Sequence, residues 1–157
     1  MKKVLLCAVV AVLLSSGQAF GFGIGAEVSA PITSSGVGGA LAITFKLDKV
    51  PYVFGLGGWG NANTFHLGAT ADYWMAQGTL IKFLDWYAGP GVFLNITTGN
   101  DSGIEGGLRI PVGIDAYFLE RRLELFLELA PAFGVSFTPF QFPTIALQNA
   151  LGFRFWF

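Results

Sequence analysis

The feature that most constrains this chain is an alternation of large apolar side chains with small or polar ones at a period of two. It is clearest over residues 123–137, where every odd position except Pro131 carries leucine, phenylalanine or valine. The even positions there include Glu124 and Glu128. A period of two puts the apolar side chains on one face of a strand, whereas a helix needs 3.6. The pattern predicts a β-strand with one apolar face.

Similar segments recur along the chain, and we expect eight strands. Their predicted ranges are 22–30, 40–47, 52–59, 65–73, 84–96, 104–118, 123–137 and 145–157. The third segment is apolar on both faces, so its phase stays open. The predicted connections are 47–50, 75–82 and 119–122 at one end, and 31–36, 60–63, 97–102 and 138–143 at the other. An even number of antiparallel strands is typical of single-chain bacterial outer-membrane barrels.

Two stretches are long enough to suggest membrane helices instead. Residues 50–71 and 129–153 contain no Asp, Glu, Lys or Arg. The first stretch holds five glycines and the second holds three prolines. Residues of this kind each cost about 1–3 kcal/mol inside a helix. We therefore interpret both stretches as strands.

The composition indicates which face of the strands meets lipid. Only 12% of the residues are charged, against roughly 25% in soluble domains, and the mean hydropathy is +0.59. A soluble barrel would turn the apolar phase inward, but an eight-stranded barrel is only just wide enough for side chains. Small and charged residues suit that space better. The sequence predicts an all-β fold, an eight-stranded antiparallel up-and-down transmembrane β-barrel with its apolar phase outward.

The first residues have the form of an export signal. Lys2 and Lys3 precede an apolar run over residues 4–14, and small residues follow up to Ala19. We expect residues 1–19 to be a signal peptide and residues 20–157 to be the barrel domain. Cys7 falls within this signal and has too short an apolar stretch before it to mark a lipoprotein. The expected location is the outer membrane.

The charged residues within the strands fall on the phase that also holds most of the glycine and alanine. We expect them to form an interior ion-pair network, because buried ions need partners. Its predicted members are Glu27, Lys46, Asp72, Glu105, Arg109, Asp115, Glu124, Glu128 and Arg154. Arg154 should lie near Glu124 and Glu128, and Arg109 should reach Glu105 or Glu128. A structural plug is the favoured interpretation, and a proton or cation path is the alternative.

Other chemistry finds little support in the sequence. His66 is the single histidine, and its neighbours on the same strand face are Thr64 and Gly68, so no Ser-His-acid triad is indicated. We find no metal-ligand spacing, phosphate loop or dinucleotide fingerprint. The formal charge of −1 offers no footprint for nucleic acid. We expect no catalytic residues, no metal, no cofactor and no enzymatic activity.

The last strand carries a recognisable pattern. Leu151, Phe153, Phe155 and the terminal Phe157 alternate in a way that resembles the signal read by the barrel-assembly machinery. From Asp72-Tyr73-Trp74 onward, notably in residues 109–114 and 123–131, the chain resembles small outer-membrane barrels of spirochaetal type, similar in architecture to OmpX and the OmpA transmembrane domain. The resemblance implies an eight-stranded barrel and little biochemistry.

The sequence thus favours a structural, membrane-anchoring barrel with a side-chain-filled interior. The expected partners are outer-membrane lipid and the assembly machinery, with any external ligand unknown. Surface recognition through the outer loops, especially Asn100-Asp101 and Phe140-Gln141-Phe142, is one alternative. Passage of small or hydrophobic solutes is another.

Overall fold

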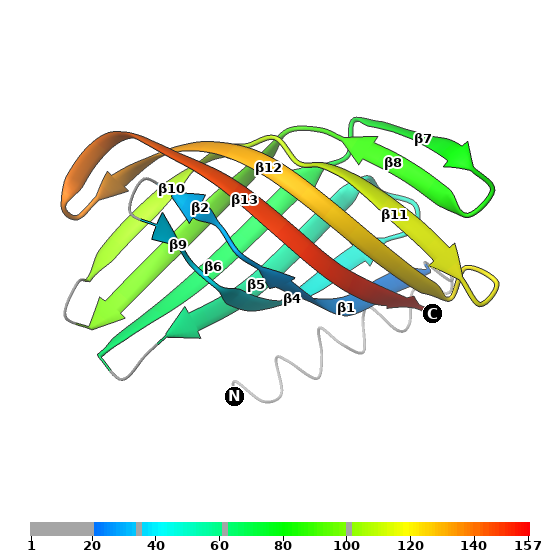
Figure 1. Cartoon of the computed structure of the whole chain (residues 1–157), viewed down its shortest axis with the longest axis horizontal. Helices are drawn as coiled ribbons and strands as arrows, with labels where there is room; N and C mark the ends of the chain where they lie inside the picture. The colour runs from blue at the N-terminus through cyan, green and yellow to red at the C-terminus, as the bar shows by residue number, and fades with distance from the viewer. Residues whose placement is uncertain (1–20, 34–35, 61–62, 100–101) are drawn as a thin grey trace, which may run out of the picture.

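A computed structural model of the chain describes residues 21–33, 36–60, 63–99 and 102–157. The predicted signal peptide, residues 1–19 with Cys7, lies outside the described residues. The described chain is built of β-strands joined by short connections (Figure 1). No helix within these ranges has the length and apolar character that crossing a bilayer requires.

Eight strands close into a ring by antiparallel pairing, which confirms the predicted fold class. The order around the ring is β13-β1-β4-β5-β6-β9-β10-β12, and the pairing of β12 with β13 closes it. Their bounds are β1 Phe22–Ser29, β4 Ala40–Leu47, β5 Tyr52–Gly60, β6 Thr64–Tyr73, β9 Gly91–Gly99, β10 Gly103–Arg109, β12 Leu123–Phe137 and β13 Phe140–Trp156. We call the end where β1 begins and β13 finishes the base, and the opposite end, with the β12–β13 turn, the mouth.

Five shorter strands extend the ring at its two ends. At the mouth, β2 (Ile32–Thr33) pairs with β13 and with β3 (Gly36–Val37). At the base, β7 (Ala76–Ile81) pairs with β8 (Leu84–Ala88), and β8 pairs with β11 (Val112–Phe118). β11 in turn pairs with the first half of β12. Figure 1 shows the β7–β8 hairpin at its upper right.

Prolines explain why two predicted strands appear as pairs of shorter ones. The fifth predicted strand is split into β8 and β9 at Gly89-Pro90, and the sixth into β10 and β11 at Ile110-Pro111. Proline has no N–H to donate to the ladder. The breaks are bridged by irregular bonds, since Gly89 N donates to Pro111 O at 3.1 Å and Ile110 N donates to Pro131 O at 3.0 Å. The two halves of each split strand therefore continue in the same direction along the barrel wall.

Strand stagger follows from tracing directly paired residues around the ring. Starting at Glu27, the partners met in turn are Ala42, Gly57, Gly68, Asn95, Glu105 and Ser136. In the other direction Glu27 pairs with Gly152, which pairs with Phe126. The two paths reach β12 at Ser136 and at Phe126, which lie ten residues apart. One full turn around the ring therefore shifts the register by ten residues. A barrel closed with such a stagger has strands tilted by roughly 35–45° from its axis.

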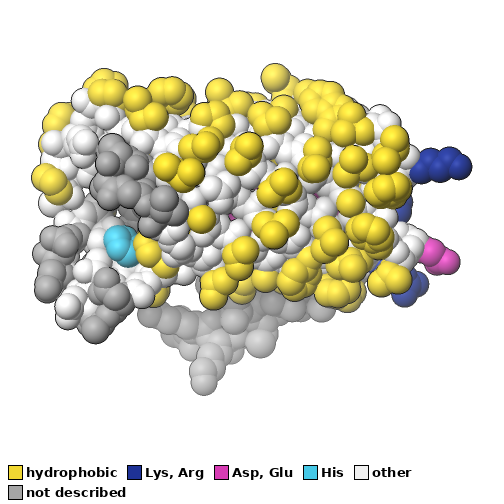
Figure 2. Space-filling view, viewed as in Figure 1, with side chains coloured by type: hydrophobic (Ala, Val, Ile, Leu, Met, Phe, Trp, Pro, Cys, Tyr) yellow, Lys and Arg dark blue, Asp and Glu magenta, His cyan; other side chains and the backbone are white. Residues whose placement is uncertain are grey.

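The apolar phase faces outward, as predicted. On β12, Leu125, Leu127 and Leu129 are exposed, whereas Glu124 and Phe126 are buried. The phase of the third predicted strand, left open by its sequence, is also defined, because Val53 is buried while Phe54 and Leu56 are exposed. Apolar side chains spread over the wall in Figure 2, and the Lys, Arg, Asp and Glu side chains that stand out project from the base.

Several predicted connections are wrong in extent. Residues 75–82 were expected to be a loop, but most of them form β7, so the turn shrinks to Lys82-Phe83. The segment lacks clean alternation, yet it pairs with β8. At the directly paired position Gly78 leaves room for Trp86, whose Nε1 lies 2.8 Å from the place a Cβ would take. The mouth connections shrink too: β13 starts at Phe140 and β9 runs to Gly99, while residues 31–36 include β2.

Candidate functional site in the barrel interior

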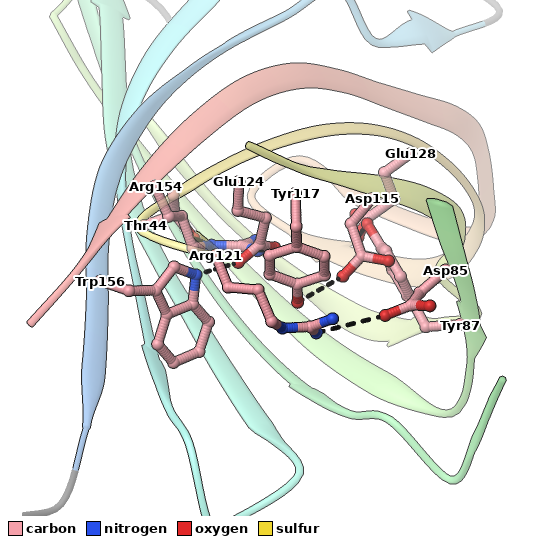
Figure 3. Close-up of polar contacts among 10 residues, drawn as sticks. All are labelled: Thr44, Asp85, Tyr87, Asp115, Tyr117, Arg121, Glu124, Glu128, Arg154 and Trp156. Atoms are coloured by element: carbon pink, nitrogen blue, oxygen red, sulfur yellow. Dashed lines mark hydrogen bonds and ion pairs between the residues drawn. The ribbon is translucent and has the colours of Figure 1, made fainter. Parts of the chain in front are cut away.

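The base half of the lumen is centred on Arg154 of β13, whose side chain is buried. Arg154 pairs with Glu124 on the neighbouring strand β12, as the hairpin register dictates. Its Nε donates to Thr44 Oγ1 at 3.1 Å, and its guanidinium lies 4.0 Å from the ring centroid of Phe126. Trp156 Nε1 donates to the second Glu124 oxygen at 2.7 Å (Figure 3). Each oxygen of the Glu124 carboxylate thus accepts one hydrogen bond.

Aromatic rings fill the space next to this pair. Trp74 stacks on Tyr87 with centroids 3.6 Å apart and planes 10° from parallel, and both side chains are buried. Lys46 Nζ lies 3.6 Å from the centroid of Trp74, a cation–π contact to a buried ammonium that has no ion pair with any carboxylate that the structure describes. Val53 completes the cluster. We call Trp74, Tyr87, Phe126, Lys46 and Arg154 the base layer.

Arg109 of β10 forms a second cluster at mid-lumen. Its Nε lies 3.1 Å from Asp72 Oδ1, its Nη2 pairs with Glu128, and its Nη1 donates to Gln148 Oε1 at 2.7 Å. Tyr87 OH donates to the other Glu128 oxygen at 2.9 Å, so the two clusters are joined through this carboxylate. Arg109, Asp72 and Glu128 are all buried. Two carboxylates therefore share one guanidinium in a low-dielectric setting, where removing one partner is costly.

Not all the predicted network residues are paired. All nine turn inward, but the structure brings together only Arg154 with Glu124, and Arg109 with Asp72 and Glu128. Asp115 accepts a hydrogen bond from Tyr117 OH at 3.0 Å, while its Oδ1 is buried without a partner. Within the described chain Glu105 accepts a hydrogen bond from the Asn95 amide alone, at 3.4 Å. Among the described residues, Glu27 has no hydrogen bond or ion pair.

The predicted contact of Arg109 with Glu105 or Glu128 is made through Glu128. One expected ion pair does not form, because Glu128 pairs with Arg109 instead of Arg154, and Arg154 is paired in register with Glu124. Glu105 stands four residues toward the mouth from Arg109 on the same strand.

The mouth half of the lumen is not filled, which corrects the expected side-chain-filled interior. A cavity of about 600 Å³ extends from Arg109 and Glu128 at mid-lumen to Gln141 and Pro143 beside the β12–β13 turn. Its wall includes Ala42, Gly55, Gly57 and Gly68. These inward positions carry little or no side chain, so the lumen stays open there while aromatic rings close it at the base.

His66 does not sit in a catalytic arrangement. Its Nδ1 lies 2.9 Å from Thr97 Oγ1, and its ring stacks on Trp59 with centroids 4.7 Å apart. No carboxylate contact of His66 is present in the described part of the chain. Within the same residues no group of three or more His, Cys, Asp and Glu side chains is arranged to hold a metal.

The residues of the predicted assembly signal lie on the lipid-facing side of β13. Leu151, Phe153, Phe155 and Phe157 are all exposed. Phe157 N donates to Phe22 O at 3.0 Å and the two rings stack 5.4 Å apart, so the last residue is tied to the first ring strand. Their role in assembly stays a prediction.

Comparison with known proteins finds the fold but no family. No protein-family model matches the chain, and no curated protein matches it. The solved structure of Neisserial surface protein A matches over 87% of this chain and 96% of that one, with 14% identity and a TM-score of 0.53. Its likeness agrees with the closed eight-stranded ring.

Two further structures match with lower scores. Ail, the attachment invasion locus protein of Yersinia pestis, covers 88% of this chain and 99% of its own at 9% identity and a TM-score of 0.47. A major outer membrane protein from Thermus thermophilus covers 87% and 99% at 15% identity and a TM-score of 0.34.

The location follows from the ring and its surface. Closure satisfies the backbone hydrogen bonds between strands, and the outward phase is apolar, the combination that a bilayer requires of a spanning sheet. Such closed antiparallel barrels are the architecture of bacterial outer membranes. The chain is an integral outer-membrane β-barrel.

In this outer-membrane barrel, several interior residues were absent from the predicted network. Tyr87, Thr44 and Gln148 each bind a network member, and Trp74 holds Lys46. The sequence pattern could have identified Tyr87, Thr44 and Gln148, because they share the inward phase of their strands with the charged residues. Trp74 carries no such signal, since it lies in the irregular link between β6 and β7.

Proposed function

We propose that this barrel is a sealed, non-conducting element of the outer membrane with a structural, membrane-anchoring role. The observation that carries the proposal is the base layer, in which stacked rings and a buried ion pair occupy the lumen. A solute crossing the barrel has to displace Trp74 from Tyr87 and Arg154 from Glu124. Breaking a buried ion pair costs about 3–5 kcal/mol.

The apolar wall supports the anchoring part of the proposal. Its partner is outer-membrane lipid, which the exposed leucine, isoleucine and phenylalanine side chains meet around the ring. The barrel-assembly machinery is the second proposed partner, through Leu151, Phe153, Phe155 and Phe157. We also propose that the base, where β1 begins and β13 ends, faces the periplasm and that the mouth faces outward. Membership of the spirochaetal group of small barrels stays a prediction from the sequence.

Conductance measurement tests the sealed state. The barrel, refolded and shown to be closed by its heat-modifiable gel mobility, is added to planar lipid bilayers. We expect no current steps above the lipid background. A triple variant, W74A/Y87A/F126A, removes the rings of the base layer and is expected to conduct when it is folded. Regular current steps from the unaltered barrel would contradict the proposal and favour solute passage.

Recognition through the mouth is the second candidate function. The observation in its favour is the β12–β13 hairpin, where Phe140 and Phe142 are 75% and 73% exposed. Exposed apolar side chains grouped on one projecting element are typical of interaction surfaces. A double variant, F140S/F142S, is expected to leave heat-modifiable mobility unchanged while abolishing adhesion of barrel-coated beads to target cells. Equal adhesion of both forms would contradict recognition by this hairpin.

A further inference from the structure

The mouth cavity has the dimensions of a ligand site. Its volume of about 600 Å³ falls within the range of roughly 300–1,000 Å³ that small-molecule pockets occupy. Arg109, Glu128 and Gln148 at its inner end are held to one another by hydrogen bonds and ion pairs. The inner end of the cavity is therefore rigid, and a ligand entering from the mouth meets a closed floor.

The wall of the cavity is made of small residues in register. Ala42, Gly57 and Gly68 are directly paired across β4, β5 and β6, and all three line the cavity. This run of small side chains is flanked in the same register by Glu27 on β1 and by Asn95, then Glu105, on β9 and β10. The carboxylates thus stand at the two ends of a smooth, uncharged strip of wall.

The charge in the cavity is unbalanced. Its charged lining residues are Glu27, Glu105, Glu128 and Arg109. Arg109 is already shared by Glu128 and Asp72 and forms no ion pair with the other two glutamates among the described residues. Glu105 has only the long Asn95 contact, and Glu27 has no hydrogen bond or ion pair among the described residues. Low-dielectric walls concentrate the resulting negative potential inside the cavity.

Aromatic and polar groups complete the lining. Trp59 lines the cavity and is held in place by stacking on His66, while the buried ring of Phe93 lies further along the wall. Thr144 also lines the cavity, and its buried hydroxyl has no hydrogen-bond partner among the residues that the structure describes. Carboxylates near a fixed indole ring form the arrangement that attracts organic cations through charge and cation–π contacts.

We propose that the mouth cavity binds a small organic cation, a protonated or quaternary amine that carries an apolar or aromatic body. The ammonium group is attracted into the cavity by the carboxylates of Glu27 and Glu105, and the apolar body lies against the strip of small residues and Trp59. The amine supplies the positive charge that these two carboxylates lack. An inorganic ion lacks the apolar body that fills the volume, and an anion meets the wrong potential.

Calorimetric titration tests this site on the refolded barrel in detergent micelles. The probe is benzyltrimethylammonium, with benzyl alcohol as the neutral control and benzoate as the anionic control. We expect one-to-one binding of the cation and at least tenfold weaker binding of both controls. Equal binding of the three compounds, or no binding of the cation at millimolar concentration, would overturn the proposal.

Variants assign the binding to the cavity. E27Q and E105Q keep side-chain shape and remove charge, and each is expected to weaken cation binding about tenfold, the effect of losing one favourable charge contact in a partly buried site. A42K places an ammonium beside Glu27 and is expected to abolish binding. D85N removes an acid at the base, outside the cavity, and is expected to change nothing. Each variant is first shown to be a closed barrel by its heat-modifiable gel mobility. A loss of cation binding in D85N equal to that in E27Q would contradict the site.

Discussion

At the scale of single residues, the two buried arginines hold different sets of partners. Arg154 pairs with Glu124, bonds Thr44 and lies against Phe126, whereas Arg109 is shared between Asp72, Glu128 and Gln148. Both neutralise buried carboxylates. We therefore expect the free energy that each ion pair contributes to depend more on how deeply the pair is buried than on how many hydrogen bonds the arginine makes.

The Arg154–Glu124 pair leads to a stability prediction with an internal control. Arg154→Ala leaves a buried carboxylate unpaired, so the free energy of unfolding should fall by about 3–5 kcal/mol. Arg121 at the base pairs with Asp85 at 3.4 Å, but its side chain is 62% exposed. Arg121→Ala should therefore cost less than about 1 kcal/mol. Urea unfolding in lipid vesicles, followed by tryptophan fluorescence, measures both, and equal losses would contradict the burial argument.

Substitution of Arg109 is expected to lower the stability of the barrel without making it conduct ions. Arg109→Ala leaves Asp72 and Glu128 facing one another without a cation, so the temperature at which heat-modifiable mobility is lost should fall. The base layer does not depend on this guanidinium, so the variant should still not conduct in planar bilayers. Current steps from folded Arg109→Ala would show that mid-lumen, and not the base layer, closes the barrel.

At the scale of elements, the break between β8 and β9 depends on a glycine. A Cβ at Gly89 would lie 1.8 Å from the carbonyl oxygen of Tyr73, which is backbone and cannot rotate away. Gly89→Ala should therefore lower stability by about 1–3 kcal/mol or more, the usual cost of overpacking. Gly39 is the matched control, because a Cβ there meets nothing within 4 Å. The folded fraction after refolding, read from gel mobility, compares Gly89→Ala with Gly39→Ala, and equal yields would contradict the close approach.

Periodicity predicted most elements of this barrel. It identified all eight strand regions and the outward phase of seven, because alternation over many residues leaves one register that buries the charges. It missed β7, where Ala76-Gln77-Gly78-Thr79 has no apolar face and pairing depends on the partner strand. It left β5 open because the segment is apolar on both faces, and only pairing with β4 and β6 defines which face is inward.

At the scale of the whole molecule, the interior proved harder to predict than the wall. The sequence predicted which residues point inward, but the height of each inward residue along the barrel axis depends on the stagger between strands. Rings at Trp74, Tyr87 and Phe126 gather at the base, whereas Gly57 and Gly68 gather toward the mouth. A filled half and an open half thus arise from one alternating pattern.

The most direct test of this account measures which side chains of β12 face lipid. Single cysteines are placed at residues 125, 126, 127, 129 and 130 with Cys7 replaced, and nitroxide labels report their access to dissolved oxygen in vesicles. Since Leu125, Leu127 and Leu129 are exposed and Phe126 and Ala130 are buried, access should alternate with a period of two, high at the leucines. Low oxygen access at the three leucines, with high access at residues 126 and 130, would contradict a barrel that turns its apolar side chains to the bilayer.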